Sequence, residues 1–216
     1  MDREQQKRIE TYATGDSSRV LVTLLFTDLV GSTELAVALG DRRWRDLLAR
    51  HHAIVREQLD RFLGREIDCA GDGFFATFET ATHAVRCGLS LTRSLRLLGL
   101  EVRIGLHTGE CERLGEKVSG VAVHAAARLS QLARPGEILV SSTVKDVAAG
   151  SDLRFEERDA RSLKGLPGSW RLFAAVGSPR EDSGQVPQGD EDPNVHRLAP
   201  RETHQAAVAT GVAQPG

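Results

Sequence analysis

The stretch LVTLLFTDLVGST, residues 21–33, decides the fold. Its apolar run is nearly continuous and contains β-branched residues, which is typical of a central strand covered on both faces. Asp28 follows that run, and Gly31 permits a tight turn into a helix that Ser32 or Thr33 is expected to cap. The first N–H groups of such a helix can hold an anion. The stretch therefore predicts a carboxylate beside a phosphate-binding turn; the alternative is an ordinary corner in which Asp28 caps the helix.

Length and composition point to one globular domain with some additional chain. The protein has 216 residues, of which 40% are hydrophobic, as is normal for a single core of ordinary size. The formal charge is −2, acids and bases are interspersed, and only 5% of residues are aromatic. Because a phosphate backbone is bound by basic stripes and bases are stacked on aromatic rings, we expect no nucleic-acid partner.

The cysteines and the apolar runs predict a cytoplasmic protein. Cys69, Cys87 and Cys111 are odd in number and lack the spacing of metal ligands, which indicates buried free thiols in a reducing compartment. The first ten residues, MDREQQKRIE, are too polar for a secretory signal, and no apolar run is long enough to span a bilayer. We therefore expect neither export nor a membrane anchor.

Helical and strand patterns are mixed throughout residues 20–176. Residues 1–19 are polar and are expected to be a flexible segment, and the sequence from residue 177 to residue 216 is expected to be disordered because it has few large apolar side chains. Apolar periodicity predicts helices over 34–62 with a break at Gly40-Asp41, over 80–98, over 118–133 and over 143–149. Strands are predicted over 66–69, 74–78, 102–107, 137–141 and twice within 153–176, with a polar loop over 108–117.

A second acidic site lies between two of these strands. The sequence Ala70-Gly71-Asp72-Gly73 has the composition of a hairpin turn, so Asp72 is expected at an exposed tip. If this hairpin neighbours the strand before Asp28, the two carboxylates converge at one end of the sheet. Hard oxygen ligands of this kind suit Mg²⁺ or Mn²⁺ that bridges the phosphates of a nucleotide.

Six motifs in order resemble one family. FTDLVGST, AGDGFFATF, IGLHTGE, GVAVHAAARL, PGEILVSS and LKGLPG resemble the catalytic domain of the class III nucleotidyl cyclases, the adenylate and guanylate cyclases. The resemblance implies an α+β, ferredoxin-like βαββαβ sandwich that works as a head-to-tail homodimer with shared active sites. It also implies an enzyme with two Mg²⁺ or Mn²⁺ ions per site, in which the ribose 3′-oxygen of ATP attacks the α-phosphorus to give cyclic AMP and pyrophosphate.

The resemblance also assigns roles to individual residues. Asp28 and Asp72 match the metal ligands of the family, and the carbonyl of Leu29 is a further candidate. Residues 31–33, which are Gly31, Ser32 and Thr33, match the turn that contacts the phosphates. From the partner chain, Arg128 matches an arginine that stabilises charge on the phosphates, and Lys164 matches a lysine that reaches the terminal phosphate.

Three positions depart from the usual pattern of adenylate cyclases. His124 stands where the family has a ribose-positioning asparagine, and a neutral imidazole can still donate one hydrogen bond there. Asp68 stands in place of a lysine, and Lys117 in place of an aspartate or threonine, so the charges of the base pocket are exchanged. Either Asp68 and Lys117 form a structural ion pair that does not recognise the base, or both contact the base.

Three alternatives to a cyclase that uses ATP stay open. A carboxylate at the position of Asp68 resembles the glutamate by which guanylate cyclases bind guanine, so GTP is an alternative substrate to ATP. A catalytically silent cyclase-like module that binds nucleotide or only dimerises is a second alternative. A different metal-dependent phosphotransferase on the same scaffold is the third, since a fold alone does not decide a reaction.

Overall fold

The structure is a computed structural model that describes residues 18–177. The elements in chain order are β1 (Ser18–Leu29), α2 (Ser32–Arg61), β2 (Arg65–Ala70), β3 (Gly73–Phe78), α3 (Ala81–Leu97), β4 (Val102–Leu114), β5 (Lys117–Ser119), α4 (Val121–Leu132), β6 (Ile138–Ser141), α5 (Ser142–Val147), β7 (Arg154–Arg161) and β8 (Trp170–Gly177). The predicted flexible segment and disordered tail lie, over residues 1–17 and 178–216, outside the described residues. Ser18 and Arg19 belong to β1, and Gly177 ends β8, so both predicted segments reached slightly too far.

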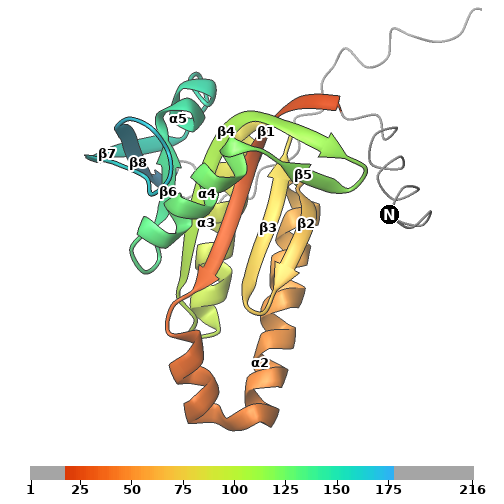
Figure 1. Ribbon diagram of the computed structural model, residues 1–216. Coiled ribbons are helices and arrows are strands. Elements are labelled where there is room, and N and C mark those ends of the chain that lie inside the picture. The colour runs from red at the N-terminus through yellow and green to blue at the C-terminus, as the bar shows by residue number, and fades with distance from the viewer. Residues whose placement is uncertain (1–17, 178–216) are drawn as a thin grey trace, which may run out of the picture. The chain divides into compact units, whose positions relative to one another are not determined.

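One mixed sheet organises the described chain (Figure 1), with the strand order β2-β3-β1-β4-β6-β8-β7. The first four of these strands, with α2 and α3 as their connections, have the predicted ferredoxin-like βαββαβ arrangement. The strand β1 lies at the centre, because it pairs antiparallel with both β3 and β4. The strand β6 pairs parallel with β4 and extends the sheet toward the β7–β8 hairpin.

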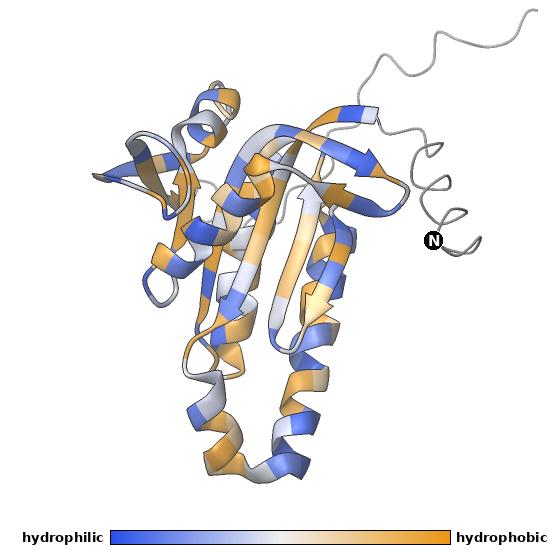
Figure 2. Ribbon diagram, viewed as in Figure 1, coloured by the Kyte–Doolittle hydropathy of each residue, from blue (hydrophilic) through white to orange (hydrophobic). Residues whose placement is uncertain are grey.

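Helices cover both faces of this sheet, as the continuous apolar run of β1 predicts. Leu25 and Leu29 of β1 point into the larger core cluster, which includes buried residues of α2, α3 and α5. Val22 and Leu24 point to the opposite face, where they pack against Ala122 and neighbouring small residues of α4. In Figure 2, β1 is apolar along most of its length and hydrophilic near the end that leads into α2. The change of polarity marks the place where a buried strand reaches solvent.

Local sequence signals set several element boundaries correctly. The helix α2 is interrupted at Gly40, whose φ of 73° and ψ of 161° are not helical, at the predicted break. Thr80 caps α3, since its hydroxyl accepts the His83 N–H at 3.3 Å. Gly99 follows α3 with a φ of 75° and donates its N–H to the Arg96 carbonyl at 2.9 Å. Such left-handed glycines end helices because they lack the Cβ that would be strained there.

The predicted polar loop over residues 108–117 and the predicted helix start at Val118 were wrong. The strand β4 continues to Leu114 and forms a hairpin with β5, in which Glu112 lies opposite Ser119. Along this extension the side chains alternate, with Cys111 buried between two exposed glutamates. One face of the hairpin is buried and the other is exposed, so many of its side chains are polar. The sequence therefore lacks the continuous apolar run by which a core strand is recognised.

The three cysteines are free, as expected, and Cys87 and Cys111 are buried whereas Cys69 is half-buried. Within residues 18–177, none of the helices has the length and apolar character required to cross a membrane.

Candidate active site

Two carboxylates meet at the end of β1. In the antiparallel pair of β1 and β3, Thr27 lies opposite Phe74, and the Phe74 N–H donates to the Thr27 hydroxyl at 3.1 Å. The β2–β3 turn therefore lies against the residues that follow Thr27. The Leu29 N–H donates to Asp72 Oδ2 at 3.2 Å, and Asp72 is half-buried, which corrects the predicted exposed tip. Asp72 is thus held beside the backbone that carries Asp28.

The charges around Asp28 are only partly balanced. Burial raises the pKa of the Asp28 carboxyl, and the neighbouring Asp72 charge raises this pKa further. The opposing influence is Arg103, which lies opposite Asp28 in the β1–β4 register and whose Nη1 is 3.7 Å from Asp28 Oδ2. Two carboxylates that repel each other at the end of a buried strand stabilise a cation bound between them.

The donor set fits a hard divalent cation. Among residues 18–177 no group of three or more His, Cys, Asp or Glu side chains gathers around a common point. The protein would therefore supply Asp28, Asp72 and the backbone carbonyl of Leu29, and the remaining positions would be left to water and to a ligand. Mg²⁺ is held in this way in nucleotide sites, by one or two carboxylates together with substrate phosphates.

The turn into α2 is built by glycine and not by a side-chain cap. Gly31 is the N-cap residue, with a left-handed φ of 65°, and within residues 18–177 this helix start has no side-chain cap hydrogen bond. The expectation that Ser32 or Thr33 caps the helix was wrong, and so was the alternative of Asp28 as the cap. A helix start without a side-chain acceptor keeps its N–H groups available to an anion.

His124 and Arg128 lie on α4, on the other side of the sheet from α2 and α3. His124 is exposed, so it is not a core histidine, and Arg128 is half-buried. The Arg128 Nη1 donates to Gln131 Oε1 at 2.8 Å, one turn further along the helix. Both side chains therefore stand at the surface of α4, where they can meet another molecule.

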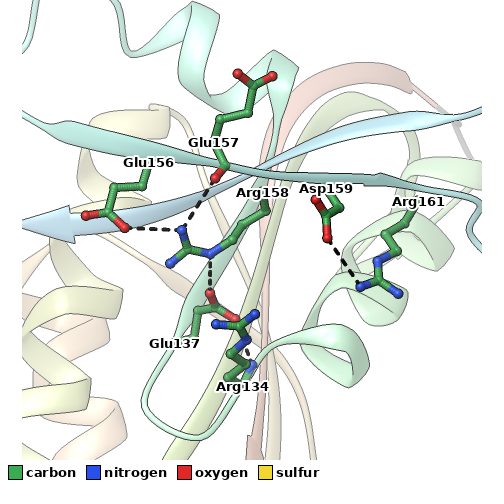
Figure 3. A network of polar contacts seen from close by, with 7 residues as sticks. All are labelled: Arg134, Glu137, Glu156, Glu157, Arg158, Asp159 and Arg161. Carbon is green, nitrogen blue, oxygen red and sulfur yellow. Dashed lines mark hydrogen bonds and ion pairs between the residues drawn. The ribbon is translucent and has the colours of Figure 1, made fainter.

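Lys164 is exposed in the loop between β7 and β8, next to the buried Leu163. An ionic network fixes the hairpin that carries this loop (Figure 3): Arg158 of β7 donates to Glu137 Oε1 at 2.9 Å and to Glu156 Oε2 at 3.1 Å. The other oxygen of Glu137 accepts the Arg134 N–H at 2.8 Å. Because residues 134 and 137 follow α4 directly, the network joins the element that carries Lys164 to the end of the helix that carries Arg128.

Asp68 and Lys117 do not form the ion pair that was one of the two alternatives. Asp68 is exposed on β2, and its Oδ1 accepts the N–H of the next residue at 2.9 Å. Lys117 is exposed at the start of β5. The ion pair that links β2 to the β4–β5 hairpin is formed by Arg65 and Glu116. The side chains of Asp68 and Lys117 are thus left to contact solvent or a ligand.

The residues predicted to bind metal, phosphate and ribose fall into two separate groups within one chain. The end of β1, the turn into α2 and the β2–β3 turn bring Asp28 and Asp72 together with residues 29–33. In the described part of the chain, no hydrogen bond or ion pair connects this group to His124, Arg128 or Lys164. We name the first group the acidic half-site and the second, which consists of His124, Arg128 and Lys164, the basic half-site of the candidate active site.

Reasoning from the sequence missed two neighbours of the acidic half-site. Arg103 belongs to the predicted strand VRIGLH, but only the β1–β4 register shows that it faces Asp28. His52 of α2 has its Nε2 atom 2.8 Å from the Gly71 carbonyl oxygen, beside Asp72. Neither residue carries a local signal, because each contact joins positions that are distant in the sequence.

Comparison with known proteins assigns a family to these features. Residues 16–176 match the model of the adenylate and guanylate cyclase catalytic domain. An uncharacterised protein of Rhizobium meliloti is 29% identical over 81% of this chain, and one of Mycobacterium tuberculosis is 31% identical over 68% of it. The chain spans 19% and 52% of the lengths of these two relatives. A protein of Podospora anserina named adenylate cyclase is 30% identical over 56% of the chain and 7% of its own length.

Solved structures show the same fold. The adenylyl cyclase CyaB of P. aeruginosa has a TM-score of 0.73 and 23% identity, over 76% of this chain and 98% of that protein. The guanylyl cyclase Cya2 has a TM-score of 0.69 and 25% identity, over 75% of this chain and 94% of its own. The guanylate cyclase domain of Catenaria anguillulae, solved with GTP, has a TM-score of 0.68 and 17% identity, over 74% and 99% respectively.

Proposed function

Because the chain belongs to the adenylate and guanylate cyclase catalytic domain family, we propose that it is a nucleotidyl cyclase that converts ATP into 3′,5′-cyclic AMP and pyrophosphate. We assign this activity to residues 20–176 of a homodimer. The observation that carries the proposal is the convergence of the Asp28 and Asp72 carboxylates beside an uncapped helix start. A metal–triphosphate complex needs both features, since the carboxylates bind the cations and the N–H groups bind the phosphates.

The acidic half-site would hold two Mg²⁺ or Mn²⁺ ions through Asp28, Asp72 and the Leu29 carbonyl. Such ions lower the pKa of an attacking hydroxyl and neutralise charge on a triphosphate. The Leu29 N–H occupies one lone pair of Asp72 Oδ2 and so fixes the direction of this carboxylate. The N–H groups of residues 31–33 donate to the phosphates, and Arg103, now paired with Asp28, adds positive charge at the same place.

The second chain would supply the basic half-site. Arg128 stabilises the charge that develops on the phosphates, and Lys164 reaches the terminal phosphate. A preorganised charge of this kind often makes the largest contribution to the rate. His124 in its neutral form donates one N–H to a ribose oxygen. The exposure of His124 and Lys164 in one chain supports a site that is completed by a partner.

Base recognition falls to Asp68 and Lys117, which are both exposed and not paired with each other. Asp68 accepts from the amino edge of a base, and Lys117 donates to a ring nitrogen or a carbonyl. This donor and acceptor set is compatible with adenine, and a carboxylate at this position also suits guanine. We therefore propose ATP as the substrate and name GTP as the competing one.

The direct test supplies the purified full chain with Mn²⁺ and either ATP or GTP and measures the cyclic product. We expect Asp72→Asn, which keeps the shape of the side chain but removes its charge, to lower the rate about 100-fold or more. The matched control is Asp60→Asn, an exposed residue of α2, which should leave the rate unchanged. Nucleotide binding without a cyclic product would instead identify a silent, nucleotide-binding module.

The shared site has its own test. Arg128→Ala and Asp28→Ala should each be inactive, but a mixed dimer contains one site with every group intact. After random exchange of chains, half of the dimers are mixed and each has one of two sites restored, so about a quarter of the wild-type activity should return. A mixture that stays inactive although the chains exchange would show that the site is not shared.

A further inference from the structure

The β2–β3 turn is held from the side of α2 by a histidine. The Nε2 atom of His52 lies 2.8 Å from the Gly71 carbonyl oxygen. Since a carbonyl oxygen only accepts hydrogen bonds, Nε2 is the protonated nitrogen of this ring. The same nitrogen is 3.8 Å from the Cys69 sulfur, and the ring stands edge-on to Phe74 with 5.2 Å between centroids. His52 therefore contacts the hairpin on both sides of Asp72.

We propose that His52 is a positioning residue for Asp72: its hydrogen bond to Gly71 fixes the turn so that the Asp72 carboxylate faces Asp28. This inference rests on the proposed metal site. Gly71 has a left-handed φ of 62°, and a glycine in a tight turn has more backbone freedom than any other residue. The carbonyl that His52 binds belongs to the peptide unit between Gly71 and Asp72, so the bond fixes the orientation of the backbone that carries the carboxylate.

A second histidine fills the space behind the turn. His51 has 0% exposure, both ring nitrogens lack a hydrogen-bond partner in the described chain, and its ring lies 5.7 Å from that of Phe74. His51 thus acts as a packing group and His52 as the hydrogen-bond donor. With Phe74 N–H bound to Thr27 and the Asp72 carboxylate bound to Leu29 N–H, the turn is tied to β1 on one side and to α2 on the other.

Loss of the His52 bond should weaken cation binding. Groups that orient metal ligands typically change metal affinity 10–100-fold when they are removed. His52→Leu removes the donor and keeps an apolar side chain of similar size, whereas His52→Gln places an amide N–H close to the position of Nε2. The control His83→Leu removes a half-buried histidine from α3. His52→Met is a second variant without a donor, in case His52→Leu does not fold.

Two measurements on the full chain test the proposal. The first is the affinity for Mn²⁺ in the absence of nucleotide, measured by electron paramagnetic resonance. We expect His52→Leu and His52→Met to bind Mn²⁺ about 10-fold more weakly or worse, and His52→Gln and His83→Leu to stay near wild type. The second is hydrogen exchange without metal, where the Leu29 amide should exchange faster in His52→Leu and at the wild-type rate in His52→Gln.

The outcomes separate this proposal from the cyclase itself. Equal Mn²⁺ affinity in wild type and His52→Leu, or a His52→Gln variant as weak as His52→Leu, would overturn the role of His52 even if the enzyme is active. A wild-type chain that binds Mn²⁺ in a His52-dependent manner but makes no cyclic nucleotide would overturn the activity and leave the positioning role standing. A wild-type chain that does not bind Mn²⁺ would remove the basis of the positioning role.

Discussion

His107 makes the stability of this domain depend on pH. It lies in β4 with only 8% of its surface exposed, its Nδ1 atom is 2.8 Å from the Ser141 hydroxyl, and its ring stands edge-on to Trp170 at 5.3 Å. Burial lowers the pKa of His107 from 6.5 to about 4. The folded protein therefore holds a neutral ring under conditions in which the unfolded chain takes up a proton.

The sign and the size of the effect follow from this difference in pKa. Below pH 6.5 the unfolded state binds a proton that the folded state excludes until about pH 4, so the free energy of unfolding falls as the pH falls through this window. Between pH 7 and pH 5, His107 alone should lower the free energy of unfolding by about 2 kcal/mol. The full difference between its two pKa values limits this loss to about 3 kcal/mol at lower pH.

The assay is urea unfolding of wild type and His107→Asn at pH 7 and pH 5. The variant keeps a polar group near Ser141 but does not titrate. We expect its loss of stability relative to wild type to be about 2 kcal/mol smaller at pH 5 than at pH 7. Burial also lowers the pKa of His51 to about 4. Because His51 is present in both proteins, its contribution to the pH dependence cancels in the stability difference between them. Ser141→Ala removes the hydroxyl but leaves the ring buried, so it should retain the wild-type pH dependence. A stability difference that does not change between the two pH values would refute the reasoning.

Three further predictions concern the elements that carry the site. A Cβ on Gly105 would lie 2.5 Å from a backbone oxygen of α4, so in urea unfolding Gly105→Ala should lower the free energy of unfolding by about 1–3 kcal/mol or more. The control is Gly88→Ala, whose Cβ would face a flexible side chain at 3.4 Å and which should change this free energy by under about 1 kcal/mol. His124→Asn should keep the thermal midpoint, since His124 is exposed, and should keep or raise the rate of cyclic product formation; a collapse in stability would contradict this. Glu137→Gln should lower the free energy of unfolding by about 1–3 kcal/mol in chemical unfolding, because the side chain of Glu137 is 11% exposed and its carboxylate pairs with the Arg158 guanidinium; an unchanged stability would show that this ion pair is not needed.

The sequence predicted the elements that have strong local patterns. The signals are the continuous apolar run of β1, the glycine that breaks α2 and the composition of the Gly-Asp-Gly turn, and all three features lie where they were expected. The extension of β4 was missed because its exposed face carries charged residues, and a polar strand supported by pairing with β5 does not differ locally from a loop.

The same distinction holds for the site. Asp28 and Asp72 were predicted because each stands in or beside a recognisable turn, and the pairing of β1 with β3 brings them close together. Arg103 and His52 were missed because neither stands in a motif, and each becomes relevant through one long-range contact. Likewise, charge alone made an ion pair of Asp68 and Lys117 plausible, while the structure joins the same two hairpins through Arg65 and Glu116.

The division of the site also bears on how its activity is controlled. One chain keeps its two carboxylates beside Arg103, which offsets only part of their repulsion, and keeps Arg128 on the far side of the sheet, bound to Gln131. The acidic half-site thus lacks the positive charge of Arg128 and Lys164, and the basic half-site lacks the two carboxylates. If a second chain completes the site as proposed, then the rate per chain depends on the fraction of dimer. Dilution below the dimerisation constant should lower the rate per chain in proportion to the protein concentration, so the total rate falls with the square of that concentration. On that proposal, keeping the chains apart would be sufficient to keep the domain inactive without a separate inhibitor.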